Sequence, residues 1–157
     1  MKICPPIIVT SVLLAASACA PASTGILNET HKTPNEIFAE YGALLQGDPD
    51  FGQFQQLFSE SRNSDLEYMI ESRLEAYWND ASRSEIENSM IAAAAKQAKC
   101  YEYDLLSEEY ADQEATLMFE ATGVCSQEEN LGDGTLEVKF RESGTWHIHE
   151  MILWPKK

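Results

Sequence analysis

The chain has 157 residues, and 44% of them are apolar, which is enough for one folded domain with a hydrophobic core. Aspartate and glutamate number 26 against 11 lysines and arginines, so the formal net charge is -15. This charge argues against a nucleic-acid-binding protein, because few cations are available to neutralise phosphates. It also disfavours electrostatic binding to an anionic membrane surface and favours a cationic ligand or a basic protein partner.

The first 18 residues have the pattern of a signal peptide. Lys2 supplies a positive charge, and the apolar run over residues 7–16 is too short to span a bilayer. The run leads into Ala16-Ser17-Ala18-Cys19, which resembles the lipobox of bacterial lipoproteins, where the cysteine is acylated and becomes the mature N-terminus. We therefore expect a signal peptide over residues 1–18 and lipidation at Cys19. Ordinary cleavage after the Ala-x-Ala sequence is the alternative.

The residue after the predicted lipid-bearing cysteine bears on location within the cell envelope. In lipoproteins of double-membraned bacteria an aspartate there favours the inner membrane, and this chain has Ala20. The resemblance therefore implies a lipid anchor in the outer membrane, facing the periplasm, whereas ordinary cleavage would give a soluble periplasmic protein. Residues 19–32 lack a periodic apolar pattern and are expected to form a tether. A single domain is expected over residues 33–157.

Four helix-start signals precede residue 100. Capping boxes, in which a serine or threonine is followed three residues later by glutamate, begin at Thr33, Ser64 and Ser82. Asp48-Pro49-Asp50 precedes a shorter helix, and Gly47 is placed to end the first one. Apolar residues at helical spacing follow each signal, so four helices are predicted.

From about Cys100 the apolar residues recur at every second position, which is typical of half-buried strands. Residues 115–122, 136–141 and 146–152 all show this alternation. Helices followed by an antiparallel meander predict an α+β fold, with the N-terminal helices packed on one face of a curved sheet.

The last two predicted strands form a hairpin. A three-residue loop at Glu142-Ser143-Gly144, with the glycine in the left-handed conformation, pairs Phe140 with Trp146 and Val138 with Ile148. In this register the apolar residues of both strands share one face.

The order of these elements resembles the nuclear-transport-factor-2-like superfamily, in particular its small bacterial lipoproteins of unassigned function. The likeness is carried by Thr33-Pro34-x-Glu36, by Gly47-Asp48 and by Gly144-x-Trp146-x-Ile148, and it covers roughly residues 33 to 154. It implies a cone-like arrangement, cystatin/nuclear-transport-factor-2-like, with a pocket between sheet and helices. Members of the superfamily include isomerases and dehydratases as well as non-enzymatic binding modules.

The strand alternation places Glu150 on the face that carries Trp146. A carboxylate buried there would have a raised pKa and could act as an acid or a base. The resemblance implies that the pocket lies on this face, where Tyr101 and Tyr103 would line it if their strand presents them inward. The alternative is that the end of the last strand leaves Glu150 at a solvated rim.

The predicted hairpin places His147 and His149 together on its other face. Lys139 would lie opposite His147 and Glu137 opposite His149. We expect no metal at this face, because a cation opposes metal binding and no fourth ligand is evident. A solvated face, or one that forms a homodimer, is the expected role. No cofactor is expected.

Two of the four cysteines are expected to form a disulfide. Cys4 leaves with the signal peptide and Cys19 is assigned to the lipid, which leaves Cys100 and Cys125 in an oxidising compartment. A turn at residues 111–114 would place them directly opposite each other on adjacent strands. The same register puts the charged Glu108 opposite an apolar position, which indicates that a bulge shifts part of the pairing.

These observations lead to three hypotheses about function. The first is a non-enzymatic binding or interaction module of the cell envelope, with a small apolar ligand in the pocket. The second is an acidic inhibitor or immunity-type protein that captures a basic enzyme, steered by the acidic charge. The third is a small-molecule isomerase or lyase that uses Glu150. A nucleic-acid partner is not expected.

Overall fold

The computed structural model describes residues 31–76, 81–125 and 132–156. The predicted signal peptide, Cys19 and most of the tether lie outside these residues. Within them, four helices are followed by four antiparallel strands, which confirms the α+β arrangement. The helices are α1 (Pro34–Gln46), α2 (Phe51–Gln55), α3 (Glu60–Ala76) and α4 (Arg83–Cys100), and the strands are β1 (Tyr101–Ala111), β2 (Glu114–Gly123), β3 (Gly134–Glu142) and β4 (Trp146–Pro155).

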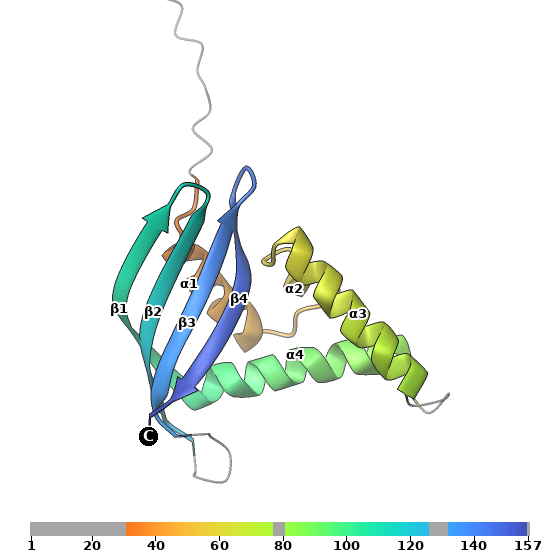
Figure 1. The fold of residues 1–157 in the computed structure, drawn as a ribbon. Coiled ribbons are helices and arrows are strands. Elements are labelled where there is room, and N and C mark those ends of the chain that lie inside the picture. Colours follow the sequence, from red (N-terminus) through yellow and green to blue (C-terminus); the bar gives the residue numbers. More distant parts are fainter. Residues whose placement is uncertain (1–30, 77–80, 126–131, 157) are drawn as a thin grey trace, which may run out of the picture.

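The strands form one sheet in the order β1-β2-β3-β4. Figure 1 shows them side by side in a curved sheet, with α4 crossing near the end where β1 begins. We call the face that packs against the helices the inner face, and the opposite face the outer face. Side chains of the inner face alternate with half-exposed residues along β2 and β3, as the period of two predicts. The most buried of them are Ala115, Leu117, Ala121, Leu136, Val138, Phe140 and Ile148.

Local capping signals set the ends of three helices as predicted. Thr33 caps α1 through a reciprocal pair of hydrogen bonds with Glu36, and Gly47 lies at its C-terminal end. Asp50 caps α2 and Ser82 caps α4 in the same way. Each cap satisfies backbone N–H groups that have no partner inside the helix.

The third helix begins five residues earlier than its capping box predicts. α3 begins at Glu60, and the hydroxyl of Ser64 donates a hydrogen bond to the Glu60 carbonyl inside the helix. The capping position is taken by Ser59, whose hydroxyl accepts from the backbone N–H of Arg62. Ser59 is itself held by β4, because its N–H donates to the Ile148 carbonyl at 2.9 Å. A contact distant in sequence therefore overrides the local signal at Ser64.

The segment before α3 lies along the edge of β4. The N–H of Ile148 donates to the Leu57 carbonyl at 2.8 Å, and Phe58 forms a parallel bridge with Ile148. These bonds satisfy backbone groups at the edge of the sheet and attach the α2–α3 corner to it.

The predicted register of the last hairpin is wrong. The loop is Ser143-Gly144-Thr145, one residue later than predicted, and Phe140 pairs with Ile148 instead of Trp146. The loop closes through a hydrogen bond from the Ser143 N–H to the Thr145 carbonyl, around a glycine with φ of 77°. The left-handed glycine is thus in the middle of the loop, and not at its end.

A β-bulge in β4 changes which residues face the helices. Phe140 pairs with Ile148 and Lys139 with Glu150, so His149 is the extra residue. One extra residue inverts the alternation beyond it, because side chains alternate with a period of two. Met151, which pairs with Val138, therefore faces inward. The prediction that Glu150 faces the helices is wrong.

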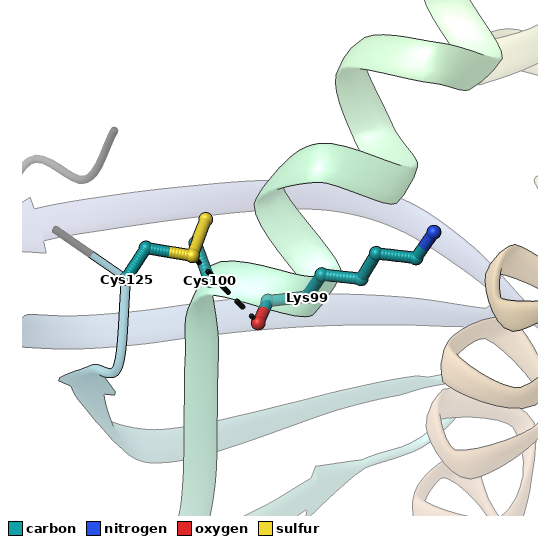
Figure 2. The surroundings of a disulfide bond; sticks show 3 residues. All are labelled: Lys99, Cys100 and Cys125. Carbon is teal, nitrogen blue, oxygen red and sulfur yellow. Dashed lines mark hydrogen bonds between the residues drawn. A yellow bond between two sulfur atoms is a disulfide. The ribbon is translucent and has the colours of Figure 1, made fainter. Parts of the chain in front are cut away.

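A disulfide joins Cys100 and Cys125, as predicted, with a Cα–Cα distance of 4.8 Å. Figure 2 shows it where α4 passes into β1, with the Cys125 sulfur 4.0 Å from the Lys99 carbonyl oxygen. The predicted bulge is also present, between Leu105 and Ser107 of β1.

The two cysteines are not directly opposite on paired strands, which corrects the predicted geometry. The bulge shifts the pairing by one, so that the N–H of Val124 donates to the Cys100 carbonyl. Cys100 is the last residue of α4 and Cys125 lies beyond the end of β2, so neither cysteine belongs to a strand.

Candidate functional site

Two neighbouring cavities lie between the helices and the inner face. One has a volume of about 300 Å³ and is walled by α3, α4 and the β3–β4 strands; we call it the α3 cavity. The other has a volume of about 340 Å³ and is walled by α1, α4 and the β1–β2 strands; we call it the tyrosine cavity. Tyr41, Ala94, Gln97 and Met151 line both, so the two cavities meet at these side chains.

The tyrosine cavity contains two of the residues predicted to line a pocket. Tyr101 and Tyr103 project from the inner face with ring centroids 6.0 Å apart. Phe38 of α1 packs edge-on against Tyr103 at 5.6 Å and stacks on Phe119 at 4.4 Å, which fixes the aromatic wall. Burial raises the pKa of Tyr103, so its hydroxyl stays protonated and can donate a hydrogen bond.

The α3 cavity has apolar walls and two positively charged residues. Arg62, Leu66, Met69 and Arg73 of α3 line it at intervals of four, three and four residues, which places them on one side of the helix. Leu136, Met151, Leu153, Met90 and Phe54 supply apolar surface from the sheet and the other helices. The side chain of Arg62 lies 3.9 Å from Asp65, while no ion pair of Arg73 occurs among the residues described.

Tyr41 is the most buried polar residue shared by the two cavities, with 8% of its surface exposed. Burial raises its pKa to about 12, and the nearby charge of Arg62 opposes that rise. Within residues 31–76, 81–125 and 132–156, no hydrogen bond joins the Tyr41 hydroxyl or the exposed Gln97 side chain to another residue, and neither group is a fully buried polar group without a partner. Two polar groups at the junction are therefore available to a bound molecule.

Glu150 and Trp146, which were also predicted to line a pocket, lie elsewhere. Glu150 is on the outer face, where its carboxylate accepts a hydrogen bond from Lys139 at 2.7 Å. That hydrogen bond lowers the pKa of Glu150, whereas a buried general acid requires a raised pKa. Trp146 packs edge-on against Tyr110, with ring centroids 6.1 Å apart. It lines a separate cavity together with Ile37 and Leu57, and neither of the two cavities described above.

The two histidines of β4 have separate environments. His147 pairs with Arg141, and not with Lys139 as predicted, while the bulged His149 turns toward the start of α3. Its Nδ1 lies 3.1 Å from the Ser59 hydroxyl and 3.2 Å from the Ser61 hydroxyl. In the part of the chain that the structure describes, no three His, Cys, Asp or Glu side chains are placed to share a metal ion.

Sequence reasoning missed the cavity arginines, although a signal for them was present. The spacing from Arg62 to Arg73 spans three helical turns, which places both on one side of any helix that covers residues 60–76. Sequence reasoning also placed Glu150 on the inner face, although a charged residue at an apolar position of a strand is itself a sign of a bulge. Glu108 gave the same sign in β1, where the bulge was predicted.

The comparisons with protein-family models, curated proteins and solved structures find no match to this chain. None of the helices that the structure describes has the length and apolar character needed to cross a membrane. The two cavities are thus the features from which a function is best inferred.

Proposed function

We propose that this protein is a non-enzymatic binding module of the cell envelope, and that it holds a small, mainly apolar ligand in the two cavities between helices and sheet. The observation that carries the proposal is the pair of cavities that meet at Tyr41 and Met151. Their volumes are at the lower end of the range of ligand pockets. A nuclear-transport-factor-2-like arrangement would place a binding site at this position.

The apolar walls of the two cavities support this proposal. Both cavities are partly open to solvent, so the apolar side chains that line them are accessible to water. Removal of apolar surface from water is favourable, and two adjoining cavities of this kind therefore favour an apolar ligand.

The residues around the cavities favour binding over catalysis. Among the described lining residues there is no Asp, Glu, His or Cys, the groups that most often act as acids, bases or nucleophiles. Glu150, on which the isomerase or lyase hypothesis depended, is paired with Lys139 on the other side of the sheet. We therefore do not propose an enzymatic reaction.

The acidic edge of the sheet favours a second candidate, capture of a basic protein. β1 carries Glu102, Asp104, Glu108 and Glu109 along an edge strand that also exposes 53% of Tyr110. An extended basic segment would find both charge and backbone partners at this edge. Salt-sensitive capture of a basic envelope protein, undiminished when the cavities are filled, would support this candidate instead.

A cavity-filling variant tests the proposed ligand site. Full-length protein carrying Cys19→Ser, purified from the periplasm, is titrated with the neutral fluorophore N-phenyl-1-naphthylamine. We expect binding that Ala94→Phe weakens at least tenfold, or about 1.4 kcal/mol, because Ala94 lines both cavities. Ala92→Phe, at an exposed position of the same helix outside both cavities, is the matched control.

Two results would contradict the proposal. One is the absence of fluorophore binding by a protein whose circular dichroism shows it to be folded. The other is equal binding by the Ala94→Phe and Ala92→Phe proteins, which would place the fluorophore elsewhere.

A further inference from the structure

We infer that the ligand of the α3 cavity is a single-chain amphiphile with an anionic headgroup, and that Arg62 and Tyr41 hold this headgroup. The inference rests on the proposed function and names the chemical class of the ligand.

The charge of the cavity is opposite to that of the protein. The chain has 26 acidic and 11 basic residues, yet the charged residues that line the α3 cavity are Arg62 and Arg73, both positive. No Asp or Glu lines either cavity among the residues described. A cation beside apolar walls attracts an anion with an apolar chain, and an anionic group would otherwise be repelled by the acidic surface.

Arg62 and Tyr41 both line the α3 cavity beside its apolar walls. The charge of Arg62 lowers the pKa of Tyr41, against the rise that burial causes. No hydrogen bond joins the Tyr41 hydroxyl to another described residue, and this oxygen is not among the fully buried polar atoms that lack a partner, so it is accessible from the cavity. Because the pKa of Tyr41 is about 12, the hydroxyl is protonated and can donate a hydrogen bond. The oxygen of a carboxylate or phosphate would accept from both Tyr41 and Arg62.

The contact that now holds Arg62 is weak enough to be replaced. Its guanidinium is 3.9 Å from the Asp65 carboxylate, which is longer than a charge-assisted hydrogen bond, and the Asp65 side chain is largely exposed. An anion bound at Tyr41 would compete with a solvated and distant partner. Arg62 can therefore turn to the ligand at little cost.

The rest of the cavity suits an apolar chain. Leu66 and Met69 follow Arg62 along the same side of α3, and Met151 and Leu153 face them from β4. Arg73 lies at the other end of this row, about 16 Å from Arg62 along the helix axis at a rise of 1.5 Å per residue. A volume of about 300 Å³ suits one medium-length chain and is small for a lipid with two chains.

Three ligands with closely matched alkyl chains and different headgroups test this inference. Displacement of N-phenyl-1-naphthylamine from the full-length Cys19→Ser protein is measured with decanoate, decyl phosphate and decanol below their critical micelle concentrations. We expect at least tenfold tighter binding of an anionic ligand than of decanol. Comparison of decanoate with decyl phosphate shows whether the site prefers a carboxylate or a phosphate headgroup.

Substitutions then locate the headgroup. Arg62→Gln should reduce the preference for the anion at least fivefold while leaving decanol binding within twofold of the unsubstituted protein. Tyr41→Phe should reduce the same preference and leave the apolar walls intact. Lys96→Gln, an equal change of charge at an exposed site of α4 outside the cavities, should have no effect.

The outcomes separate this inference from the proposed function. Equal binding of decanol and both anions would overturn the inference and leave the apolar site in place. Loss of the preference in Arg73→Gln but not in Arg62→Gln would overturn the assignment to Arg62 and Tyr41. Failure of the fluorophore and all three ligands to bind would contradict both the inference and the proposed function.

Discussion

His149 is a residue whose protonation state the fold constrains. It is the extra residue of the β4 bulge, and its Nδ1 lies within hydrogen-bonding distance of two serine hydroxyls at the N-terminal end of α3. Burial and then the charge of Arg141 lower its pKa, while Glu150, Glu114 and Asp65 act in the opposite direction. A positive charge at a helix N-terminus is also disfavoured by the helix dipole. The fold thus selects the neutral imidazole.

We predict that His149 makes the folded state less stable at acidic pH. Because its pKa is lower in the folded than in the unfolded state, the unfolded state binds more protons, and the free energy of unfolding increases with pH. The stabilisation is present above the unfolded pKa of about 6.5 and is lost as the pH falls toward the folded pKa. Urea unfolding at pH 5.0 and 7.5 should show a smaller pH dependence for His149→Gln than for the wild type.

His147→Gln, on the same strand, is the control for this measurement and should retain the wild-type pH dependence. An equal dependence in His149→Gln and wild type would contradict the role assigned to His149.

At the scale of elements, the end of a helix can be predicted from the sequence when the residues that determine it are close together in the chain. The caps of α1 and α4 depend on residues three positions apart, so the sequence alone places them. The start of α3 depends on Ser59, which is fixed by hydrogen bonding to Ile148, 89 positions later in the chain. No local pattern carries that information.

The same reasoning explains which part of the candidate site could be predicted. Tyr101 and Tyr103 precede the β1 bulge and keep the alternation that the sequence shows, so they lie on the inner face. Glu150 follows the β4 bulge, and a shift of one residue moves every later side chain to the other face. The position of a bulge depends on the partner strand and on the segment that covers the edge, which a pattern within one strand does not reveal.

Substitution by alanine should change the free energy of unfolding in opposite directions at two glycines, one in β3 and one in α1. A Cβ at Gly134 of β3 would lie 2.6 Å from the backbone oxygen of Trp154, so Gly134→Ala must separate β3 from β4 and should lower the free energy of unfolding by about 1–3 kcal/mol. A Cβ at Gly42 of α1 meets no atom within 4 Å. Gly42→Ala should raise the free energy of unfolding by about 0.5–1 kcal/mol through helix propensity.

Chemical denaturation of the two single variants and the wild type measures both effects. A Gly134→Ala protein as stable as the wild type would show that the ends of β3 and β4 adjust without cost. A destabilised Gly42→Ala protein would show that the space beside α1 is not open.

At the scale of the whole molecule, the disulfide and the N-terminal pattern agree on the compartment. The Cys100–Cys125 bridge spans 25 positions, and closing a loop of that length stabilises a domain by about 3.5 kcal/mol in the chain-entropy model. Disulfides of this kind persist in oxidising compartments such as the periplasm. The bridge at the junction of α4 and β1 therefore supports the proposal that the chain is exported, which the signal-peptide pattern of residues 1–18 also predicts.

The proposed lipid at Cys19 would fix the whole domain to the membrane. Each buried acyl methylene contributes about 0.8 kcal/mol, so several acyl chains give a practically permanent attachment. We predict that wild-type protein is found in the membrane fraction and incorporates a palmitate analogue, whereas Cys19→Ser incorporates none and is released into the periplasm after ordinary cleavage at Ala16-Ser17-Ala18. Cys4→Ser, which changes a cysteine inside the leader, should behave as wild type. Wild-type protein that is soluble in the periplasm and unlabelled would contradict lipidation, and the ligand would then be bound by a diffusing carrier and not by an anchored one.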